Sequence, residues 1–303
     1  MPHSHHHHHH DHGKDQTTGR LWISIGLNLM ITLAEFIGGL ISGSLALFSD
    51  ALHNLSDTSS LVISLGARKI AKKRADKDKT FGYKRAEIIA AFINLITLVI
   101  ISIFLIKAAV ERFIDPHPVG GWVMLITAII GVIGNFSVVF LLDSSAGNIN
   151  IKSAYIHMLA DGLASIGVLI AGILIITYQF YILDPIVTLL IAGYILWQSY
   201  QMLRETIDIL MESTPEEIDV NEIIRRMHTV AGVQDIHHMH VWRLDENNTL
   251  LESHVVIHKK DADRIEHIKH DLKHLLHDEF DIYHSTLEFE WTPCEETVVI
   301  PHH

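Results

Sequence analysis

Two histidine–aspartate pairs with the same spacing stand out in this amino-acid sequence. Three residues separate His53 from Asp57, and three residues separate His157 from Asp161. In a helix this spacing is close to one turn, so each pair projects from one helix face. Two such faces that meet would offer two imidazole nitrogens and two carboxylate oxygens, a set that suits tetrahedral zinc. These four residues are the candidate metal site.

Both pairs lie inside long apolar stretches, where charged side chains are unfavourable. A charge at the centre of a membrane helix costs about 2.5–3.5 kcal/mol even on the lenient insertion scale. Interhelical hydrogen bonding would be the simpler explanation of one isolated polar residue. Two copies with identical spacing instead favour a shared functional site.

Six apolar stretches must position these residues. A helix needs roughly 20 residues to cross a bilayer, and each stretch is about that long. The stretches span residues 21–40, 50–70, 86–110, 122–142, 154–176 and 185–203. The sequence therefore predicts an α-helical membrane protein with a six-helix domain over residues 20–208. Residues 1–19 form a histidine-rich tail that is either native or an expression tag.

The basic residues predict how the spans are oriented. Nine lysines and arginines lie between Arg68 and Arg85, around the loop that joins the second and third stretches. The positive-inside rule places this loop in the cytoplasm. Six spans then leave both termini cytoplasmic. We expect a multi-pass protein in the lipid bilayer of a prokaryotic plasma (inner) membrane.

The polar last third of the chain predicts a cytoplasmic domain over residues 209–303. Helical periodicity covers residues 215–230 and 261–278, and strand-like alternation covers residues 233–244, 250–259 and 283–291. The order helix–strand–strand–helix–strand predicts a small α/β domain of ferredoxin-like, metallochaperone-like type. Because a domain of this size has a modest core, dimerisation would add stability.

Composition and missing motifs exclude several classes of function. The formal net charge of −12 argues against a nucleic-acid partner. The single cysteine, Cys294, excludes a disulfide framework and an all-cysteine zinc site. No His-Glu-x-x-His or Gly-x-Ser-x-Gly motif is present, and four protein ligands would leave no position for an activated water, so we expect no enzyme. A membrane-anchored zinc sensor or binding protein without transport is the alternative, although six spans exceed what an anchor needs.

Other polar residues of the apolar stretches receive supporting roles. Glu35 in the first stretch is interpreted as a polar packing residue or a proton carrier. Asp50 lies one turn before His53 and is interpreted as an entrance group at the outer interface. Three further residues are interpreted as packing and capping residues, namely Asn94, Asn135 and Asp184.

Three further stretches, together with the paired motifs, resemble the cation diffusion facilitator family. They are residues 49–53 (Ser-Asp-Ala-Leu-His), 80–87 (Thr-Phe-Gly-Tyr-Lys-Arg-Ala-Glu) and 240–242 (His-Val-Trp). The chain is most similar to the zinc-transporting, cobalt–zinc–cadmium resistance branch, over almost its whole length. This resemblance implies a homodimer that exports Zn²⁺ from the cytoplasm in exchange for protons, with Cd²⁺ and Co²⁺ as further candidate substrates.

The resemblance also implies a second zinc site in the C-terminal domain, where zinc would be a regulatory ligand. Its ligands would be His240, His254, His284 and Glu290, with Cys294 as a further candidate. The alternative is a histidine-rich solvated surface. We interpret four histidines of the second predicted helix as such a surface: His267, His270, His274 and His277.

Two details of the family pattern can be tested in the structure. Strand alternation predicts that His238 and His240 share one face of their strand and that His237 points to the other. Some family members carry another zinc site between the second and third spans. Here the loop offers Asp76 and Asp78, but Lys79 and Tyr83 stand where histidines would be needed, so we expect this site to be absent or very weak.

Overall fold

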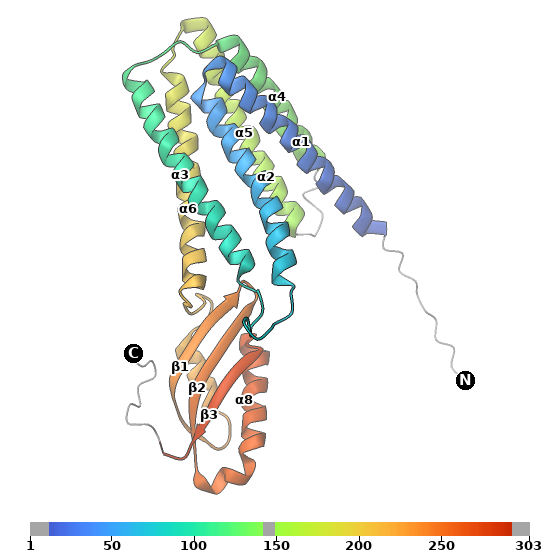
Figure 1. The fold of residues 1–303 in the computed structure, drawn as a ribbon, viewed down its shortest axis with the longest axis vertical. Coiled ribbons are helices and arrows are strands. Elements are labelled where there is room, and N and C mark those ends of the chain that lie inside the picture. Colours follow the sequence, from blue (N-terminus) through green and yellow to red (C-terminus); the bar gives the residue numbers. More distant parts are fainter. Residues whose placement is uncertain (1–11, 142–148, 293–303) are drawn as a thin grey trace, which may run out of the picture. The chain divides into compact units, whose positions relative to one another are not determined.

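The structure is a computed structural model that describes residues 12–141 and 149–292 (Figure 1). Most of the histidine-rich N-terminal tail and Cys294 lie outside the described residues. The chain divides into two compact units, which are described in turn. The first comprises the chain up to Ile63 together with Asn94–Gln201, and the second comprises Ser64–Ile93 and the chain from Met202 onward.

Among the described residues, six long helices precede the sheet and coincide with the six apolar stretches. Four of them contain described segments long and apolar enough to cross a membrane, namely Ala86–Ile114, Gly121–Phe140, Met158–Tyr178 and Leu183–Leu210. The described apolar part of the first helix, Gly26–Ser42, is shorter, and the second helix, which carries the polar site residues, is not among the four. The full count of six spans stays a prediction. The helices are α1 (His12–Ser42), α2 (Leu45–Ala71), α3 (Ala86–Ile114), α4 (Gly121–Leu141), α5 (Ile149–Tyr178) and α6 (Leu183–Leu210).

Helix α4 packs against α1 and α5 in the first unit (Figure 1). The helices approach closely because α4 presents glycines: a Cβ atom added to Gly134 would lie 2.5 Å from Cδ1 of Ile31. Small residues at such interfaces let helix backbones come together in a membrane. On the outside of the bundle, large apolar side chains such as Phe104 and Phe140 are exposed, as lipid contact requires.

Asp184 of α6 caps the start of α2. Its Oδ2 atom accepts a hydrogen bond from the Leu45 N–H (2.9 Å), and its Oδ1 atom accepts from the Ala46 N–H (3.2 Å) and the Ser44 hydroxyl (2.5 Å). These backbone N–H groups have no partner within the first turn of a helix, so the carboxylate satisfies them and complements the helix dipole. The expected capping role of Asp184 is confirmed, and it fixes the position from which α2 starts.

The second unit contains the predicted helix–strand–strand–helix–strand order. Its sheet has the order β1-β2-β3, with β1 and β2 antiparallel and β2 and β3 parallel. Helices α7 and α8 bury Ile223, Met227, Ile268, Leu272 and Leu276 in one core with the sheet. The elements are α7 (Val220–Met227), β1 (Val233–Asp245), β2 (Asn248–Ile257), the 3₁₀ helix η1 (Lys259–Arg264), α8 (Ile265–Phe280) and β3 (His284–Glu290).

An irregularity in β1 changes which side chains share a face. His237 pairs with His254 and His240 pairs with Glu252, so three steps along β1 match two steps along β2. The extra residue is accommodated by His238, whose φ of 51° is the left-handed conformation that favours glycine. Directly paired residues share a sheet face, and residues two apart on β2 do as well. His237 and His240 therefore lie on the same face, and the prediction that His237 points to the opposite face is wrong.

Candidate functional site

Helix α2 presents the first predicted pair on one face. Nε2 of His53 lies 3.5 Å from Oδ2 of Asp57, and the two side chains are 12% and 28% exposed. In α5, Asp161 is buried and His157 lies one turn before it; the side chain of His157 is outside the description. The predicted helical spacing of both pairs is thus realised, and one pair is in direct contact.

A hydrogen bond between α2 and α5 indicates where the two pairs lie relative to each other along the helix axes. The Ser165 hydroxyl donates to Oδ2 of Asp50 at 3.4 Å. The two helices run in opposite directions, because Leu47 near the start of α2 belongs to the same apolar cluster as Ile175 near the end of α5. Moving one turn from this bond along each helix leads to His53 on α2 and to Asp161 on α5. This register supports one four-residue site, which stays a prediction.

Asp50 itself lies elsewhere than expected. It is 1% exposed and hydrogen-bonded between helices, whereas the sequence suggested an entrance group at the outer interface. Its partner Ser165 also accepts a hydrogen bond from Nδ2 of Asn135 at 3.2 Å. Nearby, Nδ2 of Asn54 donates to Oε2 of Glu35 at 3.1 Å. Polar side chains from α1, α2, α4 and α5 therefore surround the candidate site on one side.

A second group of metal-ligand side chains lies in the C-terminal domain. Nδ1 of His254 is 2.8 Å from Oε1 of Glu290, and Nε2 of His237 is 3.3 Å from Oε2 of the same carboxylate. One ligand atom from each of the three residues lies within 4.8 Å of the others. Two imidazole nitrogens and a carboxylate oxygen are a typical zinc set that leaves a fourth position for another ligand.

The structure brings together only part of the ligand set implied by the family resemblance. His254 and Glu290 meet, but His284 begins β3 and Glu290 ends it. Six residues of strand span about 20 Å, so one chain cannot bind a single ion with both. The ring of His284 instead lies edge-on to Phe81, with the ring centroids 5.7 Å apart.

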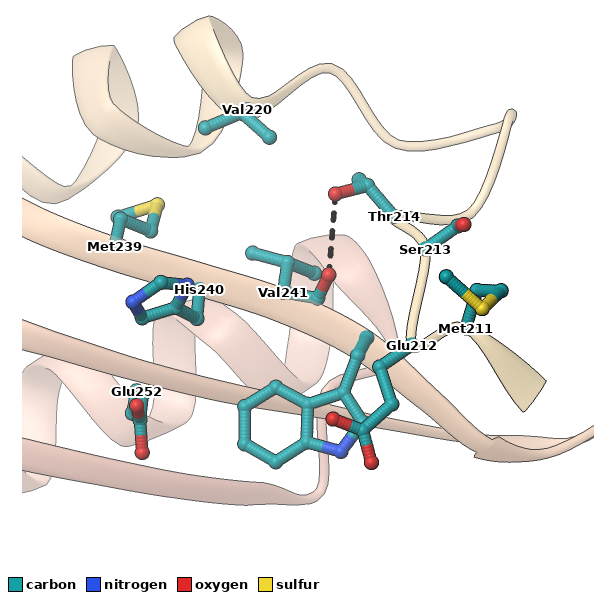
Figure 2. Close-up of a pocket in the computed structure, with 10 residues that line it drawn as sticks. Met211, Glu212, Ser213, Thr214, Val220, Met239, His240, Val241 and Glu252 are labelled. Carbon is teal, nitrogen blue, oxygen red and sulfur yellow. Dashed lines mark hydrogen bonds between the residues drawn. The ribbon is translucent and has the colours of Figure 1, made fainter. Parts of the chain in front are cut away.

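His240 lines a cavity of about 590 Å³ beside the start of the C-terminal domain (Figure 2). Its wall includes Glu252, the partner of His240 on the neighbouring strand, and residues 211–214. The Thr214 hydroxyl donates to the carbonyl of Val241 at 3.1 Å, drawn as a dashed line in Figure 2. This bond ties the end of the α6 segment to β1.

His237 is the residue that sequence reasoning missed. It is 1% exposed and occupies the position beside His254 and Glu290. Simple alternation excluded it, because nothing in the sequence marks a bulge at His238, and no glycine, the residue that most often adopts the left-handed conformation, stands there.

Two further sequence interpretations concern the histidines of α8 and the basic loop between α2 and α3. The four histidines of α8 are exposed, which confirms a solvated face.

In the loop before α3, Oδ1 of Asp76 accepts hydrogen bonds from the N–H groups of Asp78 (3.0 Å) and Lys79 (2.8 Å), and Oδ2 accepts from the Tyr83 hydroxyl (2.8 Å). The Tyr83 hydrogen bond is the main reason why the pKa of Asp76 is lowered. This carboxylate is therefore engaged by its own loop.

Long apolar helices with a half-buried histidine–aspartate pair, followed by a small α/β domain, define a multi-pass membrane protein of the metal-transporter class. Comparison with known families agrees with this class. Residues 21–211 match the cation efflux transmembrane domain, and residues 215–291 match the cytoplasmic domain of cation efflux proteins. The chain belongs to the cation efflux family, which confirms the resemblance to the cation diffusion facilitators and their zinc branch.

Similar proteins come from several bacteria. The chain is 39% identical over 273 residues to a cadmium, cobalt and zinc/H⁺-K⁺ antiporter of Bacillus subtilis, covering 86% of each protein. It is 35% identical over 297 residues to the zinc transporter ZitB of Escherichia coli, covering 97% of this chain and 94% of ZitB. It is also 35% identical over 296 residues to the metal cation efflux system protein CzcD of Cupriavidus metallidurans, covering 96% of this chain and 93% of CzcD.

A solved structure also matches part of the chain. It is the metal-bound C-terminal domain of the CzcD transporter, 33% identical, with a TM-score of 0.23. The match covers 24% of this chain and 99% of that domain.

Proposed function

We propose that this protein exports Zn²⁺ from the cytoplasm in exchange for protons, with Cd²⁺ and Co²⁺ as further substrates. The observation that carries the proposal is the His53–Asp57 contact on an intramembrane helix whose register with α5 brings Asp161 to the same level. The relatives named as zinc transporters and as a cadmium, cobalt and zinc antiporter support this substrate class. Transport, rather than catalysis, is the activity proposed.

The transport site is formed by His53, Asp57, His157 and Asp161. Two nitrogens and two oxygens suit zinc, and the imidazoles disfavour harder ions such as Mn²⁺ and Mg²⁺. Zinc binding requires neutral imidazole and ionised carboxylate, so zinc and protons compete for the same atoms. Protonation from the outer side therefore helps to expel zinc, and release of those protons to the cytoplasm readies the site for the next ion.

The energetics favour coupling to protons. A membrane potential of 100 mV, negative inside, opposes the exit of one elementary charge by about 2.3 kcal/mol, and a divalent ion faces roughly twice that. Each proton that enters in exchange offsets about one charge. No Gly-x-x-x-x-Gly-Lys-Ser/Thr phosphate-binding loop is present in the sequence, so ATP is not an evident energy source.

We further propose the arrangement of the chain in a prokaryotic plasma membrane. Residues 1–19 form a cytoplasmic tail, residues 20–208 contain six membrane spans, and residues 209–303 form a cytoplasmic domain. The basic residues between Arg68 and Arg85 support this orientation through the positive-inside rule. Both termini are then cytoplasmic.

The C-terminal domain is proposed to dimerise and to bind regulatory zinc. His254 and Glu290 form the centre of that site, and His237 is its third ligand. The fourth position is open to water or to a ligand from a second subunit. His240 and His284, which the family resemblance also suggested, would have to act at a different site or across the dimer.

The proposal is tested with purified protein in sealed proteoliposomes that carry a zinc dye and a pH dye. Zinc flux and counter-flow of protons are expected for the unaltered protein. Asp161→Ala should abolish both, while Asp78→Ala, a change in an exposed loop, should leave them intact. Near-normal flux in Asp161→Ala would refute the site. Zinc binding without any flux in the unaltered protein would favour the membrane-anchored sensor.

A further inference from the structure

A second group of buried polar side chains adjoins the proposed transport site: Asp50 lies one helical turn before His53, and Asn54 follows His53 directly. Its members come from α1, α2, α4 and α5, and each side chain is at most 1% exposed. We call this group the oxygen tier. It consists of Glu35, Asp50, Asn54, Asn135 and Ser165.

Hydrogen bonds connect the oxygen tier across helices, but they leave several of its oxygens without donors. Asn135 donates to Ser165, Ser165 donates to Asp50, and Asn54 donates to Glu35, at 3.2, 3.4 and 3.1 Å. Among the described residues, Oε1 of Glu35 and the Oδ1 atoms of Asn54 and Asn135 have no hydrogen-bond partner. Buried acceptors without a donor are unfavourable, so three of them in one place call for a bound group.

Gly131 of α4, which has no side chain, leaves room for the unpartnered Oε1 atom of Glu35. A Cβ atom added to Gly131 would lie 2.5 Å from Oε1 of Glu35 and 3.1 Å from Oγ of Ser165. Both oxygens therefore lie against the same glycine, where any larger residue would displace them. The free carboxylate oxygen points into the oxygen tier rather than out toward lipid.

The charges in the oxygen tier point to a cation as the bound group. Within the part of the chain that the structure describes, neither Glu35 nor Asp50 forms a salt bridge. Two carboxylates buried together in a membrane are strongly unfavourable unless a positive charge accompanies them. A single proton would satisfy one donor–acceptor pair and leave other oxygens unpaired. Two carboxylates with amide and hydroxyl oxygens resemble the oxygen sets that bind divalent cations.

We propose that the oxygen tier is a second cation subsite, which holds the divalent ion after it leaves the histidine–aspartate site. The inference rests on the proposed transport function. Asp50 precedes His53 on α2, and the basic loop follows the other end of α2, so the oxygen tier lies on the outward side. Oxygen ligands bind zinc less tightly than imidazole does. The oxygen tier would thus bind the ion more weakly than the histidine–aspartate site that precedes it. Passage through successive sites requires such weaker binding, so that the ion can leave.

Binding of Mn²⁺ tests the subsite directly, because Mn²⁺ prefers oxygen ligands. Full-length protein in nanodiscs is titrated with Mn²⁺, and electron paramagnetic resonance measures the free ion. Glu35→Gln should weaken the tightest Mn²⁺ site roughly tenfold or more, the size of effect typical for groups that support a metal site. Glu111→Gln, the same change at an exposed carboxylate, should not alter the affinity of the tightest Mn²⁺ site. His53→Ala should also retain this site.

A second variant, which adds a ligand, keeps the proposal testable if Glu35→Gln does not fold. Asn135→Asp places a third carboxylate in the oxygen tier and should tighten Mn²⁺ binding. Unchanged Mn²⁺ affinity in both Glu35→Gln and Asn135→Asp would overturn the proposal. Loss of the Mn²⁺ site in His53→Ala but not in Glu35→Gln would also overturn it, because the ion would then occupy the histidine–aspartate site.

Zinc flux in proteoliposomes separates an exit subsite from a proton carrier. Glu35→Gln should lower the maximal rate roughly tenfold, with little change in the zinc concentration that gives half-maximal flux, because the loading site is intact. Loss of proton movement with unchanged Mn²⁺ affinity would assign the oxygen tier to protons and refute the cation subsite. If the unaltered protein moves no zinc, the transport proposal fails, whereas the Mn²⁺ titration still decides whether the subsite exists.

Discussion

Removal of the Asp184 carboxylate should destabilise the membrane domain without touching a proposed metal ligand. This side chain is fully buried and accepts three hydrogen bonds at the start of α2. Nη1 of Arg112 lies 3.7 Å from its Oδ2 atom. Asp184→Ala would leave the N–H groups of Leu45 and Ala46 without their acceptor and Arg112 without its counter-charge.

The expected magnitude follows from the two interactions that Asp184→Ala removes. Loss of an N-terminal helix cap costs about 0.5–2 kcal/mol. Breaking a buried ion pair costs about 3–5 kcal/mol, and Arg112 is partly exposed, so the lower end applies. Together these suggest a loss of about 3.5–5 kcal/mol. Asp184→Asn, which keeps one acceptor oxygen, should lose less.

Thermal unfolding of the purified protein, followed by tryptophan fluorescence, measures this effect. A domain of this size shifts by roughly 2–4 °C per kcal/mol, so Asp184→Ala should lower the midpoint by at least about 6 °C. Asp115→Ala is the matched control, because that side chain is 84% exposed in a loop. A midpoint within about 2 °C of the unaltered protein would show that α2 does not depend on this cap.

Three further predictions concern selectivity, regulation and pH. Replacing His53 and His157 by aspartate should admit Mn²⁺ to vesicles that otherwise take up zinc, since oxygen ligands suit harder ions; native Mn²⁺ transport as fast as zinc transport would contradict this. The isolated domain (residues 213–303) should bind zinc by calorimetry, and Glu290→Gln should abolish that binding. Hydrogen bonding to Arg226 on α7 lowers the pKa of Glu279, so its stabilising effect should be present at pH 7 and lost as pH falls below the ordinary glutamate value of about 4.3. The difference in urea unfolding between the native domain and Glu279→Gln should therefore vanish in acid, and a difference that grows in acid would show the opposite sign.

Local patterns in the sequence were sufficient for the order of the elements and for one half of the proposed transport site. Apolar stretches of membrane-spanning length coincide with α1 to α6, and the switch to strand-like alternation coincides with the C-terminal domain. The His53–Asp57 contact follows from helical spacing alone, because residues four apart lie on one face of any helix. These features depend on neighbours along the chain, so periodicity reveals them.

The tertiary structure decided how distant segments are matched. Asp184 caps a helix that begins 139 residues earlier in the chain, and Ser165 meets Asp50 across 115 residues. In the sheet, the bulge at His238 brings His237 to His254, and the length of β3 separates its first residue from Glu290. Register and bulges are set by pairing between strands and by packing between helices. Residue types and their spacing along one segment carry no record of those pairings, so the sequence predicted candidate ligands while the fold determined which of them meet.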